Sequence, residues 1–96
     1  MIEVRQTAMF RIWHASLKDR RAAARIAIRI DRMALGNPGD VKSVGDGVQE
    51  MRIDYGPGYR VYFSRRGEVL TVLLCGGDKR TQTADIARAK VLMREI

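Results

Sequence analysis

The chain has 96 residues, of which 46% are hydrophobic and 30% are charged, so it can bury a core of its own and we expect one domain over residues 1–96. No apolar run approaches the ~20 residues that span a bilayer, and the first residues lack the basic start and apolar middle of a secretory signal, so we expect a cytoplasmic protein. The formal net charge of +7 makes nucleic acid or an acidic protein the expected partner.

The positive charge is concentrated in the N-terminal third of the chain. Residues 1–35 carry eight lysines and arginines against three acids, whereas residues 36–70 carry five charges of each sign. Charge alone therefore favours a partner at the N-terminal third, although a basic helix is often only a solvated face.

The chain begins with a predicted strand and a short helix. Residues 2–6 alternate apolar and polar side chains, which is typical of a strand. Thr7 can cap a helix on which Phe10, Trp13 and Leu17 form one apolar stripe.

A second helix is predicted from its N-cap, Asp19, to Leu35, with Gly36 ending it. Its apolar residues share one arc and its basic residues share the neighbouring arc. The basic arc comprises Lys18, Arg21, Arg25, Arg29 and Arg32. The two helices would form a hairpin with a core side and a cationic side. Ile28 and Leu35 fall beside the arginines and are either apolar contacts for a partner or ordinary exposed side chains.

A loop and three strands follow. Residues 36–47 contain four glycines and a proline, which predicts a loop. Strands are predicted at residues 48–54, 59–64 and 68–75, and the first two are joined by a Gly-Pro-Gly turn. The third of these strands is apolar on both faces, as expected of a central strand.

The last segment starts with a Gly-Gly bend and ends in a helix capped by Thr81 or Thr83. The apolar stripe of this helix comprises Ile86, Ala89, Met93 and Ile96. The order strand, helix, helix, three strands, helix predicts an α+β fold. We expect a small antiparallel sheet with an N-terminal helical hairpin and a C-terminal helix.

Residues that several kinds of enzyme require are missing. The single histidine, His14, is predicted to be a surface or half-buried helix residue, and the single cysteine, Cys75, a buried apolar residue at the end of the central strand. No zinc-ligand spacing and no glycine-rich phosphate motif occurs. We therefore expect neither a metal nor a cofactor.

The predicted strands place cations on the face opposite their apolar side chains. Arg52 and Arg60 project from this face, which we expect to be open to solvent, and they should lie close across the strand pair. Tyr62 shares the face and can stack a base or orient a phosphate. Lys42 and Lys79 can reach the same edge.

Such a cluster can clamp phosphate, because a guanidinium binds phosphate through a planar fork. An RNA strand supplies its own nucleophile, the 2′-hydroxyl, so cutting it requires a base, an acid and charge stabilisation. Each residue also has a simpler interpretation. Arg52 can pair with Glu50 or Asp54, the two lysines can be solvated, and Tyr62 can lie on apolar sheet surface.

Three stretches carry a resemblance to a known family. They read GNPGDVKSVGDGVQEMRID from residue 36, GPGYRVYF from residue 56 and GGDKRTQ from residue 76. In combination they resemble the RelE/ParE toxin superfamily, specifically its HigB-like or phage Gp49-like branch of addiction-module killer proteins, over about Phe10 to Lys90. The resemblance implies a RelE-like fold. It also implies a type II toxin that cuts messenger RNA on the ribosome until a small helix-turn-helix antitoxin neutralises it.

The resemblance implies roles for individual residues as well. Arg60 matches the strand arginine that contacts the scissile phosphate, and Arg52 matches a second basic position on the preceding strand. Lys42 and Lys79 match positions before that strand and after the last one. The C-terminal helix has neither the histidine nor the tyrosine that serves some members as general acid. Lys79 is therefore the candidate acid, followed by Tyr62, and Lys42 is the candidate base.

The leading hypothesis is a metal-independent, ribosome-dependent endoribonuclease. The residues expected to dock on ribosomal RNA are Arg21, Arg25, Arg29 and Arg32. The alternatives are a ParE-like inhibitor of DNA gyrase, which needs no strand cations, and a nucleic-acid-binding module without activity. The antitoxin would bind either the helical hairpin with Ile28 and Leu35 or the face that carries Arg60.

Overall fold

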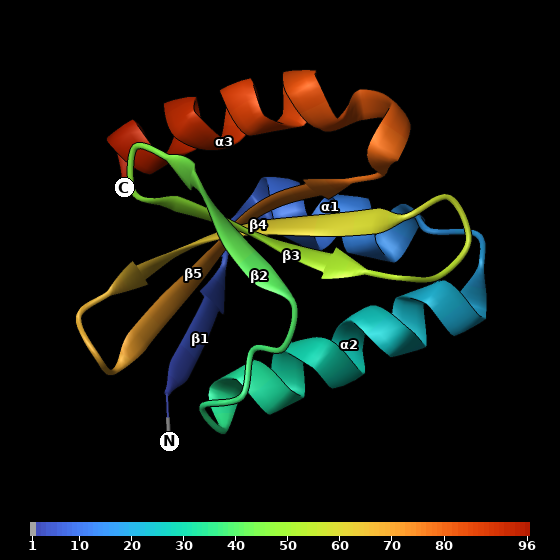
Figure 1. Cartoon of the computed structure of the whole chain (residues 1–96), viewed down its shortest axis with the longest axis horizontal. Helices are drawn as coiled ribbons and strands as arrows, with labels where there is room; N and C mark the ends of the chain where they lie inside the picture. The colour runs from blue at the N-terminus through green and yellow to red at the C-terminus, as the bar shows by residue number, and fades with distance from the viewer. Residues whose placement is uncertain (1) are drawn as a thin grey trace.

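A five-stranded sheet lies between two helices on one face and one helix on the other (Figure 1). The computed structural model describes residues 2–96. Its elements in chain order are β1 (Glu3–Gln6), α1 (Ala8–Ser16), α2 (Arg20–Ala34), β2 (Val41–Gly45), β3 (Val48–Ile53), β4 (Tyr59–Arg66), β5 (Leu70–Gly77), the single-turn 3₁₀ helix η1 (Lys79–Thr81) and α3 (Gln82–Glu95). The α+β class and the order of the predicted elements are confirmed, with one strand more than the sequence predicted.

The sheet is mixed, so the prediction of an antiparallel sheet is wrong. The strand order is β1-β5-β4-β3-β2, and β1 runs parallel to β5 while the other pairs are antiparallel. Alternation along residues 2–6 identifies a strand, but its direction depends on a partner at the other end of the chain. The central position of β5, between β1 and β4, agrees with its apolar sequence.

The additional strand, β2, lies within the segment predicted as a loop. Its register pairs Lys42 with Glu50 on β3. Gly45, Asp46 and Gly47 have φ angles of 97°, 54° and 79°, so this part of the segment is the tight hairpin turn between β2 and β3. The glycines that suggested a loop therefore mark a turn beside a strand.

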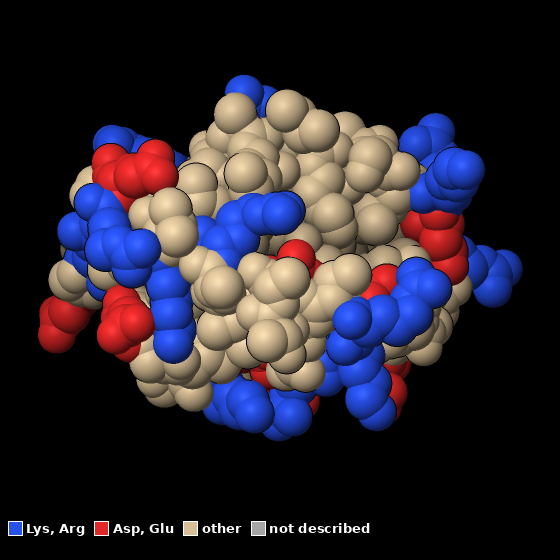
Figure 2. Space-filling model, turned by 90° about the horizontal axis from the view of Figure 1, so that it is seen from above, with Lys and Arg blue, Asp and Glu red and all other residues tan. Residues whose placement is uncertain are grey.

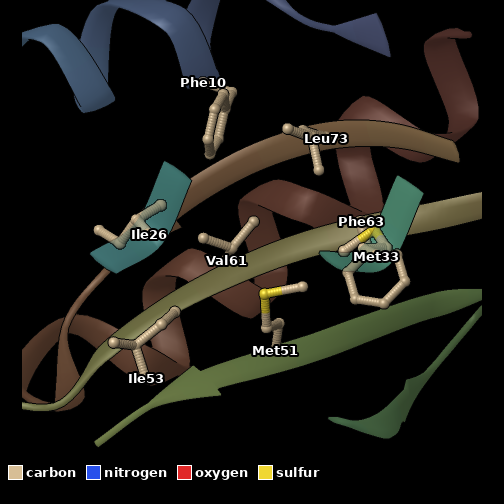
Figure 3. Close-up of a cluster of buried hydrophobic side chains, with 8 residues drawn as sticks. All are labelled: Phe10, Ile26, Met33, Met51, Ile53, Val61, Phe63 and Leu73. Atoms are coloured by element: carbon tan, nitrogen blue, oxygen red, sulfur yellow. The ribbon is translucent and has the colours of Figure 1, made fainter. Parts of the chain in front are cut away.

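The main core lies between the sheet and the pair α1 and α2 (Figure 3). Its buried residues are Phe10, Ile26, Met33, Met51, Ile53, Val61, Phe63 and Leu73. The predicted starts of α1 and α2 are confirmed, because Thr7 accepts a hydrogen bond from the amide of Phe10 at 3.0 Å and Asp19 caps α2. Thr81 occupies the N-cap position of α3, as predicted, but its side chain makes no capping hydrogen bond. His14 is half-buried, with its Nε2 3.0 Å from the carbonyl oxygen of Ala23.

Helix α3 covers much of the second face of the sheet, so the prediction that this face is open is wrong. A second buried cluster comprises Val48, Tyr62, Leu74, Cys75 and Ala89. Ile86 and Met93 of α3 pack against it. The apolar stripe of α3 must be removed from water, and the face opposite α1 and α2 is where the sheet can receive it.

The Gly-Gly pair predicted as a bend instead ends strand β5. A Cβ atom at Gly76 would overlap the ring of Trp13, and one at Gly77 would overlap the carboxylate of Asp85. Glycine is therefore required here for close approach of α1 and α3 to the sheet. Over residues 2–96, the helices are all too short or too polar to cross a membrane.

Candidate functional site

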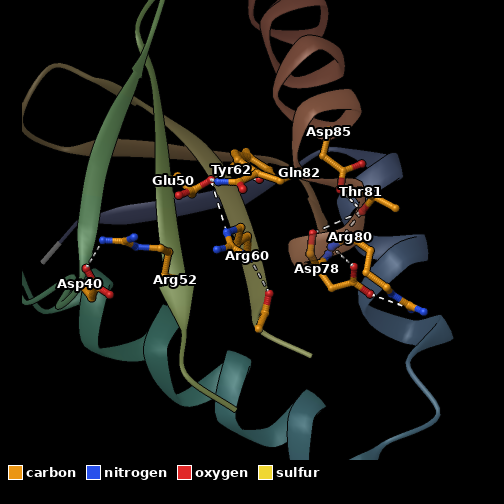
Figure 4. Close-up of polar contacts among 11 residues, drawn as sticks. Asp40, Glu50, Arg52, Arg60, Tyr62, Asp78, Arg80, Thr81, Gln82 and Asp85 are labelled. Carbon is orange, nitrogen blue, oxygen red and sulfur yellow. Dashed lines mark hydrogen bonds and ion pairs between the residues drawn. The ribbon is translucent and has the colours of Figure 1, made fainter. Parts of the chain in front are cut away.

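Arg52 on β3 and Arg60 on β4 lie directly opposite each other in the sheet (Figure 4). They face the same side of the sheet as Tyr62 and Glu50, which form the next cross-strand pair. Helix α3 begins at Gln82, beside Glu50, and runs away from the two arginines. The predicted proximity of the two arginines is confirmed, and they lie just beyond the end of the covering helix.

Arg60 was predicted to project from a face open to solvent, but its side chain is largely enclosed. Its side chain is 11% exposed. Nη1 donates to the carbonyl oxygen of Gly58 at 2.9 Å, and Nε lies 3.6 Å from Oε2 of Glu50. These two contacts hold the guanidinium in one position.

Glu50 is the centre of a buried polar network that the sequence prediction missed. Its carboxylate is fully buried, and Oε2 accepts hydrogen bonds from the Tyr62 hydroxyl at 3.1 Å and from Nε2 of Gln82 at 2.8 Å. A buried charge is tolerated where it is paired and hydrogen-bonded. The alternation along β3 did place Glu50 on the same face as Arg52. A carboxylate on a face that α3 had to cover could have indicated a buried polar network.

Tyr62 cannot stack on an RNA base in this structure, and that prediction is wrong. Its side chain is fully buried. Burial raises the pKa of its phenol well above the ordinary value of 10.0, and the neighbouring Glu50 carboxylate raises it further. The hydroxyl is therefore a weaker acid than an ordinary phenol, and it is buried with its proton donated to Glu50, which argues against Tyr62 as an acid in catalysis.

Arg52 is the more accessible of the two strand arginines. Its side chain is 42% exposed, and Nη2 lies 3.3 Å from Oδ1 of Asp40, in the segment before β2. Asp40 therefore takes the place of Glu50 and Asp54, the partners that the sequence suggested. An exposed ion pair of this kind contributes little and exchanges readily with solvent.

The two lysines flank the arginine pair from opposite sides. Lys42 is exposed on β2 and pairs with Glu50 of β3, two residues before Arg52 on that strand. Lys79 is exposed in η1, and its Cβ lies close to the space beside Gly58, where Nη1 of Arg60 also lies. The backbone positions of the two lysines thus lie on either side of the arginine pair, and their participation in one cationic cluster remains a prediction.

The arginines of α2 belong to the other face of the sheet. Arg21, Arg25 and Arg32 are exposed. Arg29 instead donates to the carbonyl oxygens of Arg52 at 2.7 Å and Pro38 at 3.0 Å, so it joins α2 to the sheet. Arg29 is half-buried and less free than the other three, and an RNA contact by any of the four remains a prediction.

The two exposed apolar residues singled out on α2 differ in their surroundings. Ile28 lines a hollow of about 660 Å³ beside the arginines, whereas Leu35 lies outside it at the end of the helix. Their side chains are 49% and 72% exposed. The structure therefore gives Ile28 a concave environment and Leu35 none.

Charge on the α3 side of the molecule is divided (Figure 2). In this view basic side chains gather at the two ends and along one rim, with acidic groups beside several of them, and a broad uncharged area lies between them. Within residues 2–96, no group of three His, Cys, Asp or Glu side chains is placed to hold a metal ion.

Cys75 is buried, as predicted, and lies near the end of the central strand β5, in the second buried cluster. Burial raises the pKa of its thiol to about 12 from an ordinary 9.0. The thiol is therefore protonated near neutral pH, and a thiolate is the reactive form of cysteine.

The chain matches no protein-family model. A protein of Haemophilus influenzae, described as an uncharacterized protein, is 52% identical over 95 residues, which cover 99% of this chain and 96% of that protein. Identity at this level over nearly the whole of both chains indicates common descent and the same fold. The chain therefore belongs to the same protein family as this Haemophilus influenzae protein.

Proposed function

We propose that the protein is a toxin of the RelE/ParE kind that cuts messenger RNA on the ribosome and is held inactive by a helix-turn-helix antitoxin. The observation that carries this proposal is the cross-strand pair of Arg52 and Arg60, with Lys42 and Lys79 on either side. The four basic residues come from four elements and lie around the part of the sheet beyond the first turn of α3. That arrangement suits the negatively charged transition state of phosphodiester cleavage.

The proposed reaction uses the RNA's own 2′-oxygen as nucleophile. The 2′-oxygen forms a bond to phosphorus, the bond from phosphorus to the 5′-oxygen breaks, and the products are a 2′,3′-cyclic phosphate and a 5′-hydroxyl. In its neutral amine form Lys42 takes the proton from the 2′-hydroxyl, and Lys79 in its ammonium form gives a proton to the leaving 5′-oxygen. Arg52 and Arg60 stabilise the charge on the phosphorane. Arg60 is held by Glu50 and Gly58, so its guanidinium needs little reorganisation.

A second candidate function is binding without cutting, as a DNA gyrase inhibitor or a nucleic-acid-binding module. The observation that favours it is the enclosure of Arg60, whose 11% exposed side chain is paired with a fully buried carboxylate. Such a pair can have a purely structural role, with no part in catalysis. Arg52 and the lysines would then supply only surface charge.

The test is to induce the protein in cells, map new 5′-hydroxyl ends on transcripts and measure plasmid supercoiling in the same cultures. Arg52→Ala is the decisive variant, because its side chain is accessible and its removal leaves no buried charge. Arg65→Ala is the matched control, since Arg65 is exposed toward the other end of β4. We expect Arg52→Ala to lower cleavage by about 100-fold or more and Arg65→Ala to leave it unchanged.

Undiminished cleavage by a folded Arg52→Ala protein would remove Arg52 from the mechanism. Changed supercoiling without new transcript ends would favour the gyrase inhibitor. Arg60→Ala is a less clear variant, because it leaves the buried Glu50 carboxylate without its cation.

A further inference from the structure

A hollow lies between α2 and the end of β3, on the face of the sheet opposite the strand arginines. Its volume is about 660 Å³. The residues that line it are Arg21, Ala24, Arg25, Ile28, Arg29, Arg32, Ile53 and Asp54. The hollow therefore combines an apolar part, from an alanine and two isoleucines, with four guanidinium groups and one carboxylate.

Two of these arginines are held in position by the protein itself. The guanidinium of Arg25 lies 4.5 Å from the centre of the Tyr55 ring. Arg29 donates to the carbonyl oxygens of Arg52 and Pro38. A ligand would meet cations whose side-chain freedom has already been reduced, which lowers the entropic cost of binding them.

The apolar lining indicates what kind of ligand the hollow fits. Ile28 is 49% exposed although it lies in a concave surface, so its side chain is available for contact with a partner. A phosphate backbone offers anionic oxygens but no large apolar side chain to pack on Ile28, and among residues 2–96 no aromatic ring lines the hollow for a base to stack on. An acidic peptide with a large apolar side chain satisfies both parts of the surface.

We propose that this hollow is a docking site for an acidic segment of a partner protein. One large apolar side chain of the segment packs on Ile28, and its carboxylates pair with Arg21, Arg25 and Arg32. Charge complementarity favours an acidic segment, because among residues 2–96 four arginines and one carboxylate, that of Asp54, line the hollow. The site is separate from Arg52 and Arg60, so the proposal stands whether or not the protein cuts RNA.

The test is a selection of displayed random peptides on the full-length protein. We expect the enriched peptides to combine several acidic residues with a leucine, isoleucine or aromatic residue. Enriched peptides are then synthesised, labelled and titrated with the protein by fluorescence anisotropy. Their affinity should fall about tenfold in Ile28→Ala and by a similar factor in Arg25→Ala, and it should fall with added salt.

Ile12→Ala is the matched control, because Ile12 is an exposed apolar residue of α1 that lies outside the hollow. Peptide affinity should be unchanged in this variant. Ile28 and Arg25 are both exposed, so the variants should fold normally, which circular dichroism checks.

Three results would overturn the proposal. The first is a selection that enriches no acidic peptides. The second is an acidic peptide whose affinity does not change in Ile28→Ala or Arg25→Ala. The third is a short labelled RNA that binds with a dependence on Arg25 while no selected peptide does. Transcript cleavage by the same variants is measured separately, so unchanged peptide affinity with intact cleavage would reject the docking site and leave the nuclease proposal.

Discussion

Two arginines that face each other across β3 and β4 occupy different environments. Arg60 is 11% exposed and is paired with a carboxylate that is fully buried, whereas Arg52 is 42% exposed and is paired with the exposed Asp40. Gln82, the first residue of α3, donates to the Glu50 carboxylate that pairs with Arg60, and Arg60 lies one strand further into the sheet than Arg52.

The sequence pattern alone gives Arg52 and Arg60 the same task of binding phosphate, whereas their environments suit them to different tasks. A buried ion pair fixes geometry and is costly to break, whereas an exposed pair can exchange its partner for a ligand at little cost. In the proposed reaction Arg60 would therefore be the rigid part of the phosphate site and Arg52 the part that RNA reaches first.

The largest expected effect comes from removing Glu50. Glu50→Ala leaves the Arg60 guanidinium without its carboxylate and the Tyr62 hydroxyl without its acceptor. We expect the free energy of unfolding to fall by about 3–5 kcal/mol, as for other broken buried pairs. Urea unfolding followed by circular dichroism measures this change.

The double variant Glu50→Leu with Arg60→Met is the control for this prediction. If the cost of Glu50→Ala comes from an uncompensated buried charge, replacing both partners with apolar residues should recover most of the lost stability. A loss below about 1 kcal/mol in Glu50→Ala would mean that Arg60 is as well solvated as Arg52, and the contrast between the two arginines would disappear.

A smaller effect is expected for Tyr62→Phe, which removes one of the two hydrogen bonds to Oε2 of Glu50 and leaves the ring in place. The expected cost is about 1–3 kcal/mol, because the acceptor is charged and buried. Tyr59→Phe is the matched control, since the Tyr59 ring packs against the main core and no hydrogen bond ties its hydroxyl within residues 2–96. Equal stability of the Tyr62→Phe variant and the wild-type protein would contradict a buried network at Glu50.

The same variant has a distinct response to alkaline pH. Burial raises the pKa of Tyr62 above its ordinary value of 10.0, so the folded protein retains a proton that the unfolded chain releases. This contribution to stability is complete below pH 10.0 and declines as the pH rises further. Above pH 10.0 the wild-type protein should therefore lose more stability than Tyr62→Phe. Parallel curves for the two proteins would contradict the assignment.

The elements that the sequence predicted well depend on local chemistry. Thr7 and Asp19 cap their helices through residues two or three positions away. The alternation of β3 and β4 and the short turn between them determine that Arg52 and Arg60 meet. Each of these features is determined by neighbours in the sequence, so spacing and residue type are sufficient to find it.

The features that were missed depend on contacts between distant parts of the chain. Glu50 is bonded to Gln82 on α3, and β1 pairs in parallel with β5. Neither contact follows from local periodicity, and the burial of Tyr62 is a consequence of where α3 settles. The apolar stripe of α3 was visible in the sequence, and it could have signalled that the second face of the sheet is covered.

The smallest expected effect comes from the exposed pair. Asp40→Ala removes the carboxylate beside Arg52, and both side chains are substantially solvated, with 42% of Arg52 and 60% of Asp40 exposed. We expect the free energy of unfolding to change by less than about 1 kcal/mol, and by less still in high salt, because water and ions screen the pair. If Arg52 meets RNA as proposed, Asp40→Ala should leave transcript cleavage intact or raise it, since the competing carboxylate is gone. A loss of stability as large as that of Glu50→Ala would show that the two pairs are equivalent, and the division of tasks between the two arginines would then be wrong.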